Sequence, residues 1–140
     1  MASRWPAKYR SEKEVLEERA NHKNDKYILQ EKIIPKILDG KRAWFRSFWA
    51  FGKAIPVWWD DQTHIYELIS ASELKNFNLR KLAQITKIIA GLSKLDFFST
   101  EIVLTANNKF VVIDYVNDQC DMRFKFLHLD GVLDSTIESI

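Results

Sequence analysis

The chain has 140 residues, a length typical of one domain that is large enough to form its own core. Hydrophobic residues make up 46% and charged residues 29%, which excludes a disordered chain, and no apolar run reaches the length of a membrane span. The formal net charge of +2 is unevenly divided: residues 1–53 hold 13 Lys and Arg against 7 Asp and Glu, and residues 54–140 hold 8 against 12.

This charge asymmetry has two interpretations. One is a basic surface for nucleic acid, which is disfavoured because the basic residues are mixed with acidic ones and form no block. The other is a single site at which basic strands meet phosphates and acidic strands meet a metal ion. The four glycines form neither a P-loop nor a G-x-G-x-x-G motif, so a glycine-rich phosphate cradle would have to come from elsewhere.

The single cysteine, Cys120, excludes a disulfide framework and a cysteine-based zinc cluster. The first residues do not follow a signal-peptide pattern, and no membrane partner is expected. These features predict a cytoplasmic protein.

The chain is predicted to be a single domain in which residues 1–24 form a basic segment and a surface helix. Ser11 and Glu14 have the spacing of a capping box at the start of this helix. In residues 25–140 the apolar patterns predict strands, of which the third contains Pro56 and is therefore expected at an edge or a bulge. The first four predicted strands are 27–34, 42–51, 54–60 and 64–69.

A long amphipathic helix is predicted at 79–95, after a short turn capped by Ser70 or Ser72. It is followed by two further strands and a last helix at 132–140. The predicted class is α+β, with an antiparallel sheet of about five to six strands covered by the long helix. His64 and the Trp58–Trp59 pair are expected to serve packing or a turn.

Residues 97–123 contain two strand-like runs joined by Asn107-Asn108, which suits a tight hairpin because Asn tolerates positive φ. A loop of two or four residues places Glu101 directly opposite Asp114, whereas a loop of odd length would not. On the same side-chain alternation, the other face of the hairpin is aliphatic and suits a helix-covered core.

Two opposed carboxylates repel, so something must offset their charge. A Mg²⁺ ion between them would do so, because Mg²⁺ binds one or two carboxylates together with phosphates and water. The alternatives are that a Lys or Arg neutralises them or that one carboxylate is solvated. Arg46, in the middle of an aromatic strand, is likewise either paired structurally or directed at an anion.

The order of these motifs resembles the C-terminal half of an ATP-grasp domain. The landmarks are a strand with Gln-Glu (ILQEKI), an arginine strand with a turn (WFRSFWAFGKAI), a long helix, and two carboxylate strands that end near an asparagine (STEIVLT and FVVIDYVN). The resemblance covers residues 26–123. It implies ATP and Mg²⁺ as cofactors and an ATP-grasp C-terminal subdomain fold.

The resemblance also assigns roles to individual residues. Glu101 and Asp114 correspond to Mg²⁺ ligands, Asn117 to the asparagine of the metal site, and Arg46 to the arginine that meets phosphate or acyl phosphate. Asp114 and Asn117 are three residues apart, whereas the family spaces the corresponding residues two apart, so Asn117 reaches the site only if the strand contains a bulge. Without a bulge, Asp118 and Arg123 are expected to take the site roles. Arg123 is a second catalytic candidate. The adenine hinge and ribose contacts correspond to Gln30, Glu31, Lys32, Ile33 and, more weakly, Asp39.

Nothing before Tyr27 is long enough to form the first ATP-grasp subdomain. We therefore expect a C-terminal portion of an ATP-dependent carboxylate–amine ligase that acts through an acyl phosphate and has little activity alone. Its expected partners are a nucleotide with Mg²⁺ and either an N-terminal half or a second copy. The alternative is a non-catalytic module in which the fold serves interaction or self-association.

Overall fold

The computed structural model describes residues 11–24, 26 and 30–140. The chain divides into two compact units, residues 1–32 and 33–140, which are described separately. In the first unit α1 spans Glu12–Asn21, and its N-cap residue Ser11 accepts a hydrogen bond from the Glu14 backbone N–H at 3.3 Å. No residue of α1 is buried, so the predicted surface helix is confirmed.

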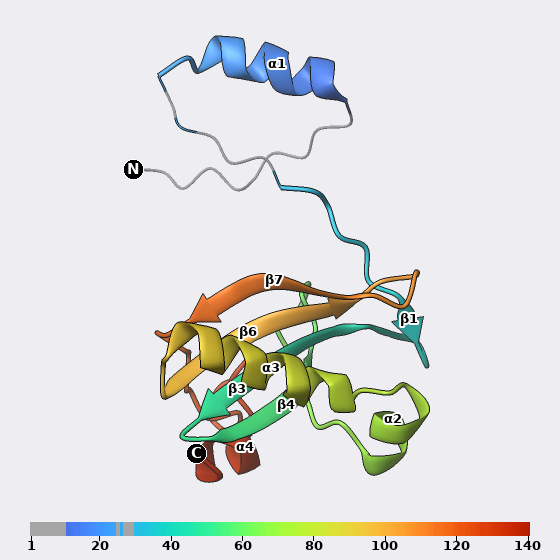
Figure 1. The fold of residues 1–140 in the computed structure, drawn as a ribbon, viewed down its shortest axis with the longest axis vertical. Helices are drawn as coiled ribbons and strands as arrows, with labels where there is room; N and C mark the ends of the chain where they lie inside the picture. Colours follow the sequence, from blue (N-terminus) through green and yellow to red (C-terminus); the bar gives the residue numbers. More distant parts are fainter. Residues whose placement is uncertain (1–10, 25, 27–29) are drawn as a thin grey trace. The chain divides into compact units, whose positions relative to one another are not determined.

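The second unit is built on a five-stranded antiparallel sheet with the order β5-β4-β3-β6-β7 (Figure 1). A two-stranded hairpin precedes it. This arrangement confirms the predicted α+β class. The strands are β1 (Ile37–Leu38), β2 (Lys41–Arg42), β3 (Trp44–Ala50), β4 (Lys53–Trp59), β5 (Tyr66–Glu67), β6 (Phe97–Leu104) and β7 (Phe110–Asn117).

One face of the sheet is covered by α3, which spans Arg80–Ser93 and follows the short α2, Ala71–Asn76. Leu82 of α3 packs in one buried cluster with Phe45 and Ile102 of the sheet, and Ile89 packs in a second cluster with Phe98. Ser70, one of the two predicted caps, caps α2 with a complete capping box, and the predicted short turn is a short helix.

A buried polar contact joins α3 to the sheet. The Thr86 hydroxyl lies 2.7 Å from the Ser47 hydroxyl of β3 and 2.7 Å from the Leu82 carbonyl. These groups therefore satisfy one another inside the core, where an unpaired hydroxyl would be costly.

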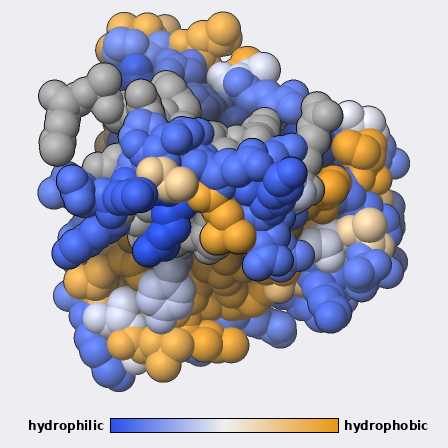
Figure 2. Space-filling model, turned by 90° about the horizontal axis from the view of Figure 1, so that it is seen from above, coloured by the Kyte–Doolittle hydropathy of each residue, from blue (hydrophilic) through white to orange (hydrophobic). Residues whose placement is uncertain are grey.

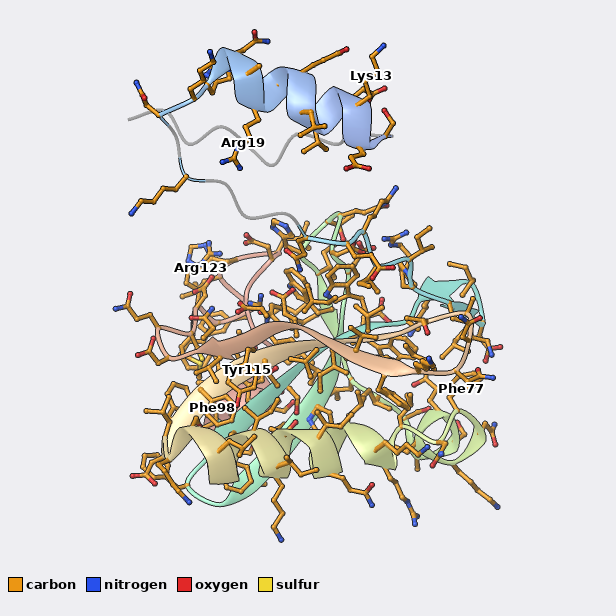
Figure 3. All side chains as sticks on the ribbon, turned by 45° about the horizontal axis from the view of Figure 1, so that its top comes forward. Lys13, Arg19, Phe77, Phe98, Tyr115 and Arg123 are labelled. Atoms are coloured by element: carbon orange, nitrogen blue, oxygen red, sulfur yellow. The ribbon has the colours of Figure 1, made fainter. Side chains whose placement is uncertain are left out.

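The opposite face is partly covered by the segment after β7, which ends in α4, Asp134–Glu138. Val132 of this segment is buried against Phe48, Val57 and Tyr66 of the sheet. Figure 3 shows Arg123, also in this segment, on the other side of the sheet from α3.

Pro56 lies in a strand that the order places inside the sheet, between β3 and β5. However, β5 pairs only with Trp58 and Trp59. Pro56 pairs with Ser47 of β3 on one side, and on its other side β4 has no partner strand. At this local edge the missing N–H of proline costs no hydrogen bond between strands.

The predicted strand at 27–34 is not formed in its described part. Residues 27–29 lie outside the described residues, and residues 30–34 have no regular secondary structure. The chain reaches the sheet only at Pro35, which bridges Thr105, and at Lys36, whose N–H donates to the Leu104 carbonyl. Within the described residues, 30–34 have no paired strand, and Gln30 and Glu31 interrupt the apolar pattern there.

None of the described helices combines the length and apolar character that crossing a membrane requires.

Candidate functional site

The β6–β7 hairpin brings Glu101 and Asp114 opposite each other, as predicted, but by a different route. Leu104 pairs with Phe110, so the loop contains five residues, and this odd length shifts the register near the turn by one residue. A bulge between the Ile102–Val112 and Glu101–Asp114 pairs removes the shift. The predicted positive φ falls on Asn108, at 57°.

Because the loop has an odd number of residues, some hairpin side chains lie on a different face of the sheet from the one predicted. Val112 pairs with Ile102 and packs on the core under α3, instead of lying on the carboxylate face. The aliphatic face is therefore formed by a partly different set of residues, because alternation changes side at each bulge.

A second bulge determines where Asn117 lies. Asn117 pairs with Ser99, and Asp114 pairs with Glu101, so three residues of β7 span the same interval as two residues of β6. Since Ser99 and Glu101 share one face of β6, the register places Asn117 on the face of Asp114. The Thr100 hydroxyl donates to the Asp114 carbonyl at 2.8 Å within this irregular stretch. The bulge that the three-residue spacing requires is present.

Arg46 completes a row of charged residues across three adjacent strands. It pairs in register with Glu101 on β6, which pairs on its other side with Asp114 on β7. The Arg46 guanidinium forms an ion pair with the Glu101 carboxylate, and their side chains are only 13% and 12% exposed. The second Glu101 oxygen accepts a hydrogen bond from Trp44 Nε1 at 3.2 Å.

Aromatic rings surround the Arg46 guanidinium. Its Cζ lies 4.3 Å from the centroid of the Trp59 ring, and its Nη1 donates to the Tyr66 hydroxyl at 3.0 Å. Burial acts to lower the pKa of Arg46, but Tyr66 and Glu101 outweigh it and the pKa is raised, so the guanidinium is permanently charged. Burial also raises the pKa of Tyr66, despite the opposing effect of Arg46, so the phenol stays protonated at neutral pH.

The two carboxylates of the row are in different environments. Glu101 is buried and neutralised by Arg46, whereas Asp114 is exposed. Of the offsets considered from the sequence, the structure therefore contains an arginine partner for one carboxylate and solvent for the other. Arg46 Nε is buried and has no acceptor within the described part of the chain. The cluster thus retains one unused, positively charged donor.

The donor set can be compared with the needs of a metal ion. Nowhere in the described residues do three His, Cys, Asp or Glu side chains gather as a metal site. Glu101, Asp114 and the Asn117 amide provide two carboxylates and one neutral oxygen. This set is compatible with Mg²⁺, which completes its octahedron with water and substrate phosphates.

A pocket of about 310 Å³ adjoins the charged row at Trp44 and Trp59. Its cationic residues are already paired: Arg42 contacts Asp61 at 2.7 Å, and Lys41 contacts Glu67 at 2.6 Å. The lining also includes Gly40, Trp58, Asp60, Gln62 and Ile65. The pocket walls therefore consist of aromatic side chains and of cationic side chains that are already paired with carboxylates.

The turn at the pocket rim makes a testable contribution to acid stability. The Asp60 carboxylate accepts hydrogen bonds from the backbone N–H groups of Gln62 and Thr63, at 2.7 and 3.2 Å, and these bonds lower the pKa of Asp60. A lowered pKa gives stability that is complete above the unfolded-state pKa and is lost as pH falls through the folded-state value. Asp60→Asn should therefore be less stable than wild type at pH 7, by about 1 kcal/mol or less for this partly exposed turn, and the difference should shrink in acid.

Urea unfolding between neutral pH and pH 3 measures this effect. The exposed aspartate of another turn, Asp39, supplies the control variant Asp39→Asn, which makes the same change of side chain while keeping both Asp60 hydrogen bonds. Parallel stability curves for wild type and Asp60→Asn would contradict the expectation.

None of the remaining predicted site residues lies on the strands that carry the charged row. Gln30, Glu31 and Lys32 are exposed and belong to the first unit, while Ile33 begins the second. Asp39, the weaker ribose candidate, lies in the β1–β2 turn with a φ of 47°.

Arg123 belongs to a separate ion-pair cluster. It contacts the carboxylates of Asp121 at 2.7 Å and Asp130 at 3.1 Å, and these contacts raise its pKa. The cluster closes the loop between these residues on the surface. The guanidinium thus has a structural role in the C-terminal segment.

The sequence predicts Arg46 among the aromatic residues of its own strand, and the spacing of two residues places Trp44 on the same face. Sequence reasoning missed Trp59 and Tyr66 as neighbours of Arg46, because they come from two other strands, β4 and β5. His64 stacks on Trp59 with ring centroids 5.3 Å apart and has a φ of 62°, so its predicted turn and packing role is confirmed.

Comparisons of the chain with models of protein families, with curated proteins and with solved structures gave no match.

Proposed function

We propose that this chain supplies the carboxylate and arginine side of a Mg²⁺–nucleotide site of the ATP-grasp type. The observation that supports this proposal is the row Arg46–Glu101–Asp114 across β3, β6 and β7, with Asn117 turned to the same face by a bulge. A purely structural ion pair needs only Arg46 and Glu101. It gives no reason for a second, exposed carboxylate directly beside the first, where the two charges repel.

The residues of the row have complementary tasks in this proposal. Bound Mg²⁺ would neutralise charge on the nucleotide phosphates, as it does in phosphoryl-transfer sites. Asp114 and Asn117 offer oxygen ligands from β7, and Glu101 offers its carboxylate from β6. Trp44 Nε1 orients the Glu101 carboxylate through its hydrogen bond. The buried Glu101 would be shared between the metal ion and Arg46.

Arg46 would hold an anionic group of the substrate. Its guanidinium is pre-positioned by the Trp59 ring and the Tyr66 hydroxyl. A planar, permanently charged donor suits a phosphate or an acyl phosphate. On this basis the reaction class is ATP-dependent carboxylate–amine ligation.

The chain is expected to be incomplete as a catalyst. None of its four glycines lies in a glycine-rich loop, and the residues assigned to the adenine hinge have no strand in their described part. The nucleotide would therefore contact a second subdomain, from another chain or from a longer form of this one. We expect weak binding of Mg²⁺·ATP and little turnover by the 140-residue chain.

Titration of Mg²⁺·ATP, followed by tryptophan fluorescence and calorimetry, tests the proposal. Asp114→Asn is the most informative variant, because Asp114 is exposed and its loss should leave the fold intact. We expect it to weaken Mg²⁺·ATP binding about tenfold or more, since even groups that only support a metal ligand have effects of this size. Trp44, hydrogen-bonded to Glu101, provides a local fluorescence signal.

The matched control is Asp96→Asn, which removes an exposed carboxylate just before β6. This variant should bind like wild type. Equal binding by Asp114→Asn and wild type, or binding that does not depend on Mg²⁺, would refute the proposed site.

A further inference from the structure

The helix α3 has a second apolar surface that faces away from the sheet. Its inner side is buried through Leu82 and Ile89, but Ile88 is 63% exposed and Leu92 is 68% exposed. Leu95, just beyond the helix, is 36% exposed. In Figure 3 side chains of α3 project away from the sheet on this outer side.

The spacing of these residues matches a helix-packing seam. Ile88, Gly91 and Leu92 follow the pattern i, i+3 and i+4, which places them on one face of α3, and Leu95 follows directly after the C-cap residue Lys94. Gly91 is exposed, and a Cβ added there would meet nothing within 4 Å. The seam therefore has aliphatic knobs beside an open position that allows close approach of a second helix.

The charged residues of α3 and its C-cap are all basic. Residues 80–95 contain four basic residues, Arg80, Lys81, Lys87 and Lys94, and no Asp or Glu, and the first acidic residue after them is Asp96. Lys87 directly precedes Ile88 within α3, so it occupies a flanking position of the kind from which coiled-coil residues form interhelical ion pairs, and Lys94, the C-cap residue of α3, lies at the end of the seam. Figure 2 shows hydrophobic surface in orange beside hydrophilic surface in blue along the lower edge of the view.

These basic residues disfavour a second copy of α3 as the helix that packs on the seam. Two copies packed on the same seam would bring lysines against lysines, which is unfavourable and is not offset by any carboxylate on the helix. A helix with carboxylates at its flanking positions would pair with Lys87 and Lys94 while burying Ile88 and Leu92.

We propose that the outer face of α3 is a docking site for an acidic amphipathic helix of a partner protein. The proposal is independent of the nucleotide site, because it concerns the helix-covered side of the sheet. The interaction is a helix-on-helix contact with an apolar centre and charged flanks.

Fluorescence anisotropy with a synthetic probe tests the docking site. The probe is a helical peptide of about three heptads with Leu at positions a and d and Glu at e and g, and its counterpart carries Lys at e and g. We expect the Glu peptide to bind at least about tenfold more tightly than the Lys peptide, because of charge complementarity. Ile88→Ser/Leu92→Ser should weaken binding of the Glu peptide by about tenfold or more.

A charge reversal separates specific docking from nonspecific attraction. Lys87→Glu/Lys94→Glu should reverse the preference between the two peptides, whereas Lys75→Glu/Lys109→Glu, which makes the same change in net charge at exposed positions elsewhere, should leave it in place. All of these positions are exposed, and circular dichroism checks that the variants are folded.

Three results would overturn the proposal. These are equal or absent binding of the two peptides, binding only to phosphatidylcholine vesicles containing about 30% phosphatidylserine, and self-association of the chain that Ile88→Ser/Leu92→Ser abolishes. The second result would indicate a membrane surface, and the third would indicate a second copy.

Discussion

Arg46→Met is expected to destabilise the fold by about 3–5 kcal/mol, the cost of removing one partner from a buried ion pair. The change leaves the Glu101 carboxylate largely buried, with only the Trp44 Nε1 hydrogen bond to support it. It also removes the cation that packs on the Trp59 ring. Urea unfolding followed by far-UV circular dichroism measures the loss without relying on the tryptophans beside the mutation.

The double variant Arg46→Met/Glu101→Gln shows whether the cost arises from the stranded charge. With both charges removed, the destabilisation should be smaller than the sum of the two single variants, by about 1–3 kcal/mol of coupling. Arg42→Met is the matched control, because it breaks a more exposed pair with Asp61 and should cost less. Additive effects of Arg46→Met and Glu101→Gln would mean that the two side chains do not depend on each other.

The Arg46–Glu101 ion pair could not be identified from the sequence alone. Arg46 and Glu101 are direct neighbours on β3 and β6, but the two strands are separated by β4, β5 and two helices in the chain. Local patterns locate each strand but do not set the register between distant ones, which depends on how α3 packs across the sheet. An arginine partner could therefore be considered from the sequence, but not identified.

The long helix shows a different limit. Its apolar periodicity was sufficient to predict its position, and the observed α3, Arg80–Ser93, lies within the predicted residues 79–95. The predicted stripe treated all its apolar residues as one covering face, whereas the structure divides them between a buried side and the exposed Ile88 and Leu92. Periodicity reports amphipathicity, but it does not show how wide the covered arc is.

The sequence predicts the correct Glu101–Asp114 pair in the hairpin, but from a loop of even length that the structure does not have. Glu101 faces Asp114 because an odd loop and a bulge compensate each other, and neither has a sequence signature beyond the positive φ of Asn108. The spacing of Asp114 and Asn117 was more informative. It required a bulge if both were to share a face, and the register contains one.

Two glycine-to-alanine substitutions are expected to have opposite signs. At Gly131 a Cβ would lie 2.7 Å from the carbonyl oxygens of both Arg123 and Phe124. These are backbone atoms, and Arg123 O also accepts a hydrogen bond from Val132 N–H at 2.8 Å, so the contact cannot be relieved by turning a side chain. Gly131→Ala should therefore destabilise the chain by about 1–3 kcal/mol, as for other overpacked sites.

The destabilisation by Gly131→Ala should extend to the sheet, because the substituted residue directly precedes Val132, which is buried against Phe48 and Val57. Gly91→Ala provides the matched control: it lies in α3, has open space around the added methyl group, and should stabilise the chain by about 0.5–1 kcal/mol through helix propensity. Urea unfolding of both variants compares the two signs directly. A neutral Gly131→Ala would show that the backbone of residues 123–124 can move away without disturbing the packing of Val132.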